Sequence, residues 1–166
     1  MTIQDPAHSI SLLVSNKPGV LVRIALVFSR RGYNIDSLVV SPALDGNFSR
    51  ISIVARGNPD TLEQIILQLE KLVDVIHAHD HTGKSLVQRE MALFKVKACS
   101  EERTELLQIA NHFKATTLDM TETAMIFQVT GSTEKIDAIT GLLEKFGVIE
   151  FIRTGKVIMA RGDEVT

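Results

Sequence analysis

Apolar and polar residues follow two different periods along the chain, and the two periods succeed each other in a regular order. Residues 8–15 have the pattern of a buried strand, and the next apolar residues recur at helical spacing. These helix positions are Val20, Leu21, Ile24, Ala25 and Phe28. Strand patterns return at 33–41 and 48–56, and between them lies Asp45-Gly46, a pair typical of a hairpin turn.

A second helix and a closing strand complete this first half. The helix is predicted to begin with Asp60 and Glu63 as a capping pair. Its apolar positions are Leu62, Ile65, Ile66, Leu69 and Leu72. Residues 75–81 have the pattern of the last strand. The resulting order, βαββαβ, is that of a ferredoxin-like unit.

The same order recurs after a short polar connection at 82–88. Strand patterns occupy 89–99, 115–122, 123–131, 148–155 and 156–162. The two helices carry their apolar residues at Leu106, Ile109, Ala110 and Phe113, and at Ile136, Ile139, Leu142, Leu143 and Phe146. We therefore predict an α+β protein of two ferredoxin-like βαββαβ units, with domains at 1–83 and 84–166. Units this small have limited cores and exposed sheet edges, which favours a homo-oligomer.

Composition narrows the class of protein. The 166 residues carry a net charge of −2, so no basic surface for nucleic acid or an anionic membrane is indicated. The single cysteine, Cys99, excludes an internal disulfide, fits a reducing compartment and is expected to be an ordinary loop thiol. No apolar run is long enough to span a membrane, and the N-terminus lacks the pattern of a signal peptide. We expect a cytoplasmic protein.

The best candidate for a binding site is the turn Asn16-Lys17-Pro18-Gly19, between the first strand and the first helix. The N-terminus of a helix presents free N–H groups that favour a carboxylate or phosphate. Pro18 is expected to set the first helical turn, and Gly19 to leave the backbone open to a ligand. Val20 and Leu21 would add apolar contact. The turn therefore suits a small carboxylate with an aliphatic side chain; the alternative is a capped turn without a ligand.

Three histidines, His77, His79 and His81, share one face of the strand at 75–81. A metal site would need further ligands from elsewhere, so we assign no metal and favour a polar sheet face or interface. RNA binding by the sheet is a less favoured alternative, because the basic and aromatic signature of such modules is missing. The chain also lacks the hydrolase, metalloprotease and dinucleotide-binding motifs, so no catalytic residue is assigned.

The segment SNKPGVLVRIALVFSRRGYNIDSL (15–38) resembles the regulatory small subunit of acetolactate (acetohydroxyacid) synthase, whose N-terminal half is an ACT domain. The resemblance continues through LEKLVDVI (69–76), QREMALFKV (88–96) and RTGKVIMARGD (153–163), and so covers nearly the whole chain. RRGYNIDSL carries most of its specificity. It implies a cytoplasmic subunit without catalytic activity of its own.

The resemblance also implies a partner and a ligand. The partner is the large catalytic subunit, which binds thiamine diphosphate, Mg²⁺ and FAD and condenses pyruvate on the way to the branched-chain amino acids. None of these cofactors is expected on this chain. The small subunit of this family activates the large one and confers feedback inhibition, usually by L-valine. A stand-alone ACT-type amino-acid sensor, without a large subunit, is the alternative of a different class.

The effector site of the family lies between the two ACT domains of a homodimer. On matching positions, the residues implied are Asn16, Gly19, Val20 and Leu21 from one protomer and Asn34 and Ile35 from the other. The N–H groups of 19–21 would hold the carboxylate, Asn34 or nearby carbonyls the ammonium group, and Leu21 with Ile35 the aliphatic side chain. The second unit has ACSEER (98–103) at the equivalent turn and is not expected to bind an amino acid.

Overall fold

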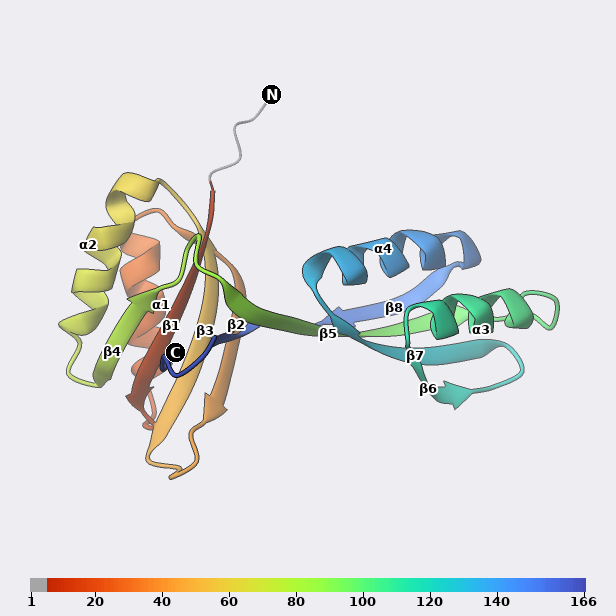
Figure 1. Cartoon of the computed structure of the whole chain (residues 1–166), viewed down its shortest axis with the longest axis horizontal. Coiled ribbons are helices and arrows are strands. Elements are labelled where there is room, and N and C mark those ends of the chain that lie inside the picture. The colour runs from red at the N-terminus through yellow and green to blue at the C-terminus, as the bar shows by residue number, and fades with distance from the viewer. Residues whose placement is uncertain (1–5) are drawn as a thin grey trace. The chain divides into compact units, whose positions relative to one another are not determined.

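The structure, a computed structural model, describes residues 6–166 in two compact units (Figure 1). The first unit contains the chain up to Gln88 together with Gly155–Thr166, and the second contains Arg89–Thr154. The predicted boundary at 83/84 lies close to the first passage between the units. The predicted second domain, 84–166, includes the C-terminal segment, whereas the contacts of this segment join it to the first unit.

The first unit has the predicted element order. Its elements are β1 (Ala7–Ser15), α1 (Val20–Arg30), β2 (Asn34–Pro42), β3 (Phe48–Arg56), α2 (Pro59–Glu70) and β4 (Val75–Asp80). The four strands pair antiparallel in the order β2-β3-β1-β4, so β2 and β4 are the edges. Figure 1 shows both helices on one face of this sheet. The ferredoxin-like plan is therefore confirmed for this half.

The core of the first unit lies between the sheet and its two helices. Alternate residues of β1 face the helices, and apolar residues at three- and four-residue spacing on α1 and α2 face the sheet. The buried cluster includes Ile10, Leu12 and Val14 from β1, Val20, Ile24 and Phe28 from α1, and Leu62, Ile65 and Leu69 from α2. Removal of this apolar surface from water is the main force that holds the unit together.

The two helices of this unit begin differently from the predictions. Asn58, not Asp60, caps α2: the Asn58 side chain accepts a hydrogen bond from the N–H of Asp60 at 2.9 Å. The predicted pair of Asp60 and Glu63 is wrong because Pro59 already occupies the first helical position. In the same way, α1 begins only at Val20, so Pro18 lies outside the helix.

The second unit repeats the plan. Its elements are β5 (Leu86–Lys97), α3 (Arg103–His112), β6 (Thr116–Met120), β7 (Ala124–Gly131), α4 (Thr133–Leu143), a 3-10 turn (Glu144–Phe146) and β8 (Val148–Arg153). The strands follow the order β6-β7-β5-β8. A further strand, β9 (Val157–Ala160), also pairs with β5 but is not part of this strand order. Phe94, Phe127, Leu106, Ile139 and their neighbours form a separate core.

The C-terminal segment, residues 155–166, is anchored on the first unit. Its residues Ile158 and Ala160 are buried. The Arg50 guanidinium donates to the carbonyl of Thr166 near the chain end. At the other end, the N–H of Lys156 donates to the Ser37 hydroxyl of β2 at 3.4 Å. The segment is therefore held by β2 and β3 and by burial of its own apolar side chains.

Candidate functional site

Gly19 forms the junction between β1 and α1. It precedes the first helical residue with φ = +83°, a left-handed conformation that favours glycine. Among residues 6–166 no side chain caps α1, and the first turn of this helix has no acidic residue. The first-turn N–H groups therefore offer hydrogen bonds and a partial positive charge to an anion.

The two residues after Gly19 have different surroundings. Leu21 is 41% exposed and is available for apolar contact. The side chain of Val20 is only 4% exposed and belongs to the core cluster. In this chain the helix begins at Val20 and turns its side chain toward the sheet, so Leu21 is the better placed of the two for the expected apolar contact. Val20 can offer a ligand its backbone N–H.

Asn16 holds the turn in place. Its side-chain amide donates to the carbonyl of Gly46 at 3.0 Å, and its backbone N–H donates to the carbonyl of Asn47 at 2.8 Å. The N–H of Ser15 donates to the carbonyl of Asp74 at 2.8 Å. The predicted ligand residue Asn16 thus has a structural function, which is to join the turn to the hairpin between β2 and β3.

Arg23 lies beside the turn, and the sequence interpretation did not include it. Its guanidinium forms an ion pair with Asp74, whose side chain is mostly buried while that of Arg23 is half exposed. A Cβ atom at Gly19 would lie 3.4 Å from Nη1 of Arg23. Arg23 therefore places a partly neutralised positive charge next to the first turn. A basic residue one helical turn after Gly19 is the signal that could have indicated it.

Asn34 and Ile35 begin β2. Asn34 is exposed, and its amide donates to Oδ1 of Asp36 at 2.8 Å. The other carboxylate oxygen of Asp36 accepts from Nε of Arg56. Ile35 is half-buried against the core cluster. The pairing with β3 shifts between Ile35 and Ser37, so a β-bulge directly follows the two predicted ligand residues.

The two halves of the predicted site lie at opposite ends of the sheet within one chain. Ser15, next to the turn, pairs with Phe48 at the beginning of β3, and Asn34 pairs with Arg56 at its end. At the rise of a β-strand, these ends are about 26 Å apart. One chain therefore cannot close the site by itself, and a second copy would have to supply the other half.

The three histidines form a row on β4 and at its end. Ring centroids are 4.8 Å apart for His77 and His79 and 6.2 Å apart for His79 and His81. The Nε2 atom of His81 is 2.7 Å from the hydroxyl of Ser11. Burial and the neighbouring charges of His79 and Arg50 lower the pKa of His77. Among residues 6–166 no group of three or more His, Cys, Asp or Glu side chains is placed to hold a metal ion.

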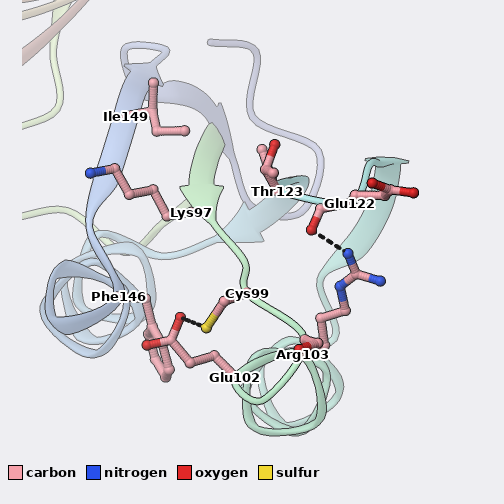
Figure 2. Close-up of a pocket in the computed structure, with 10 residues that line it drawn as sticks. Lys97, Cys99, Glu102, Arg103, Glu122, Thr123, Phe146 and Ile149 are labelled. Carbon is pink, nitrogen blue, oxygen red and sulfur yellow. Dashed lines mark hydrogen bonds between the residues drawn. The ribbon is translucent and has the colours of Figure 1, made fainter.

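A pocket of about 920 Å³ lies at the equivalent strand-to-helix turn of the second unit (Figure 2). The thiol of Cys99 donates to Glu102 at 2.9 Å, and Arg103 donates to the carbonyl oxygens of Thr121 and Glu122. Glu102 precedes the first residue of α3, at the place that Gly19 has before α1. The negative charge of its carboxylate would repel an anion there. This turn therefore lacks the anion-favouring helix start that makes the first turn a candidate.

The fold and the turn define a protein of two ferredoxin-like units, of which the first is an ACT-type domain. Residues 10–77 match a family model for the ACT domain of acetohydroxyacid synthase small subunits, and residues 89–162 match one for the small subunit of acetolactate synthase. The chain belongs to the family of acetolactate synthase small subunits.

Individual relatives cover almost the full chain. A probable acetolactate synthase small subunit of Methanothermobacter thermautotrophicus is 44% identical over 161 residues, which are 96% of either chain. An acetolactate synthase small subunit of Mycolicibacterium smegmatis is 39% identical over 98% of this chain and 95% of its own. The crystal structure of the Thermotoga maritima small subunit matches with a TM-score of 0.87 and 37% identity, over 96% of this chain and 99% of that one.

The described helices are too short and too polar to cross a bilayer, so no membrane-spanning helix is found among residues 6–166.

Proposed function

We propose that this chain is the regulatory subunit of acetolactate synthase. In the cytoplasm it activates the thiamine-diphosphate-dependent large subunit and makes that subunit sensitive to a branched-chain amino acid, with L-valine as the first candidate. Thiamine diphosphate, Mg²⁺ and FAD belong to the large subunit, and this chain has no catalytic activity of its own. The observation that carries the proposal is the glycine-initiated, uncapped first turn of α1 in an ACT-type domain of this family.

A homodimer through the β2 edges fits the exposed surface of the first unit. β2 is an edge strand, and its Leu38 and Val40 are 37% and 45% exposed. Leu21, Val22 and Leu26 of α1 are also exposed. An unpaired edge with apolar neighbours favours pairing with another strand, and a second copy offers the same surface in a closed twofold arrangement.

Antiparallel pairing of two β2 strands would bring the halves of the effector site together. In such a pair the beginning of one strand lies next to the end of the other. The end of β2 leads into the hairpin to which Asn16 is bonded. Asn34 and Ile35 of one protomer would therefore lie near the turn of its partner, and the twofold axis would give two equivalent sites.

The chemistry of the two halves is complementary to an aliphatic α-amino acid. The N–H groups of 19–21 and the charge of Arg23 would receive the carboxylate. The polar groups at Asn34 and Asp36 would receive the ammonium group, and Leu21 with Ile35 would contact the aliphatic side chain. A ligand that bridges two protomers regulates by binding more tightly to one arrangement of the dimer than to another.

Reconstitution with the large subunit tests this proposal. Acetolactate formation by the large subunit is measured alone, with this chain, and with this chain plus L-valine or D-valine. The proposal predicts higher activity with this chain, and inhibition by L-valine only. If this chain neither binds the large subunit nor changes its activity, the proposal is contradicted. Binding of L-valine without a large-subunit complex would indicate a stand-alone sensor instead.

A further inference from the structure

We propose that the contact between β2 and the C-terminal segment, at Ser37, Val39, Gly155 and Lys156, couples the effector site to the second unit. The inference rests on the proposed function and adds a route for its regulation. The chain passes between the two units at 88/89 and at 154/155. The second passage therefore lies next to the contact between the C-terminal segment and β2. This strand carries the predicted effector residues Asn34 and Ile35.

The route begins at the carboxylate of Asp36. One of its oxygens accepts from the Asn34 amide at 2.8 Å, and the other accepts from Arg56. A ligand ammonium group that reaches Asn34 would compete with this neutral amide for the carboxylate, and a charged donor forms the stronger hydrogen bond. Occupation of the site would therefore replace the bond between Asn34 and Asp36.

Asp36 lies at the β-bulge of β2. The pairing with β3 moves from Ile35 opposite Ala55 to Ser37 opposite Val54, so Asp36 is the additional residue. A bulge interrupts the ladder and redirects the side chains next to it. A change in the hydrogen bonds of Asp36 thus acts on a position where the strand is free to adjust, one residue before Ser37.

Ser37 is in close contact with the C-terminal segment. Its hydroxyl accepts the N–H of Lys156 at 3.4 Å. A Cβ atom at Gly155 would lie 2.9 Å from both the Ser37 hydroxyl oxygen and Cγ2 of Val39, closer than Cβ atoms approach other heavy atoms in proteins. Glycine at 155 therefore leaves room for the side chains of Ser37 and Val39 against the segment. A shift of Ser37 has to displace the segment at this point.

Both sides of the contact are anchored. Beyond it, Ile158 and Ala160 are buried and Arg50 donates to the carbonyl of Thr166, so the segment is fixed to the first unit. Before it, Thr154 belongs to the second unit, and its N–H donates to the carbonyl of Met91 at 2.9 Å. A displacement at Gly155 is therefore passed to the second unit over a single peptide bond.

The test compares Gly155→Ala with Gly141→Ala, where a Cβ atom would meet none of the described residues within 4 Å. Two quantities are measured for each variant: the L-valine concentration for half-inhibition of the reconstituted holoenzyme, and the Kd of the isolated chain by calorimetry. We expect Gly155→Ala to raise the half-inhibition concentration about tenfold, while Kd and activation of the large subunit stay within about threefold of the wild type. Gly141→Ala is expected to change neither.

The outcomes separate the inference from the proposed function. If the wild-type chain binds no amino acid and the holoenzyme is not inhibited, the proposed function fails before any variant is compared. If the wild type is inhibited and Gly155→Ala is inhibited equally, or loses binding and inhibition in parallel, the coupling contact is refuted. If Gly155→Ala does not fold, Ser37→Ala tests the same contact, because it removes the hydroxyl without adding volume. It is expected to raise the half-inhibition concentration about threefold at constant Kd.

Discussion

The side chain of Asn16 donates a hydrogen bond to the carbonyl oxygen of Gly46 at 3.0 Å. This bond joins the turn before α1 to the hairpin after β2, across thirty positions of sequence. It fixes the uncapped helix end at the place where an antiparallel β2 pair would bring Asn34 of a second protomer. Asn16 therefore holds the turn in position, independently of any contact that it makes with a ligand.

Substitution of Asn16 tests this anchoring. Asn16→Ala removes one side-chain hydrogen bond and is expected to lower the free energy of unfolding by about 1 kcal/mol, and to weaken L-valine binding about tenfold or more. Urea unfolding and calorimetry measure the two effects. Asn47→Ala is the control, because Asn47 takes part through its backbone carbonyl and the substitution keeps that group. Equal losses of affinity in the two variants would contradict the account.

A side chain at Gly19 should occupy the proposed carboxylate position. Gly19→Asp introduces a carboxylate beside Arg23 and the first-turn N–H groups, in a left-handed conformation that costs about 1 kcal/mol for a non-glycine residue. L-valine binding and feedback inhibition are expected to disappear, while activation of the large subunit persists.

The control for this substitution is Gly83→Asp. Gly83 has φ = +75°, and a Cβ atom there would meet no atom of residues 6–166 within 4 Å, so the same substitution is made in a similar backbone away from the turn. It should leave binding intact. Retained feedback in Gly19→Asp, or loss of activation together with feedback, would argue against a carboxylate site at this turn.

A charge on the β2 edge should separate the dimer. Val40→Lys places an ammonium group where a second copy of β2 would pair, and edge lysines oppose such pairing. We expect a monomer by analytical ultracentrifugation and loss of L-valine binding, because the proposed site is formed by two protomers. Val73→Lys, at a position 94% exposed next to β4, is the matched control and should remain a dimer. A dimeric Val40→Lys would place the interface elsewhere.

The histidine row predicts a dependence of stability on pH. Burial is the main cause that lowers the pKa of both His77 and His81 below the ordinary value of 6.5. The charge of His79 adds to it for both, with Arg50 for His77 and Lys84 for His81, while Asp80 and Glu164 oppose the lowering for His81. Below that value the unfolded chain binds more protons than the folded chain, so the free energy of unfolding falls as the pH falls.

Urea unfolding at several pH values between about 7.5 and 5.5 measures this dependence. The double variant His77→Gln, His81→Gln removes both groups and should have a flatter profile over this range than the wild type. An unchanged slope in the double variant would show that other groups cause the dependence.

Hydrophobic periodicity was sufficient to predict the order of the elements in both units. Val20, Ile24 and Phe28 of α1 and Leu62, Ile65 and Leu69 of α2 are buried as predicted, because tertiary packing and local pattern agree there. Leu21 has the same helical spacing but is 41% exposed. Helix beginnings were less predictable. Pro59 and Gly19 determine where α2 and α1 begin, through a fixed φ in one and a left-handed φ in the other, and the apolar pattern does not contain this information.

The candidate site could be predicted only in part, for physical reasons. The position of Gly19 follows from local turn chemistry. The burial of Val20 depends on the residue at which α1 begins. The pairing of Asp36 with Arg56 and the contact of Lys156 with Ser37 depend on the tertiary fold, and the latter joins residues 119 positions apart. Neither a bulge nor a chain segment that returns to an earlier domain leaves a periodic signal.

Titration calorimetry of the isolated chain with L-valine, and with D-valine as the control, tests whether the first unit binds an amino acid. We expect stereospecific binding at about one site per protomer in a dimer, with a Kd between about 1 μM and 1 mM. Absence of heat with L-valine, in a chain shown to be folded and dimeric, would contradict this expectation. The turn at 16–19 would then be a connection between strand and helix without a ligand.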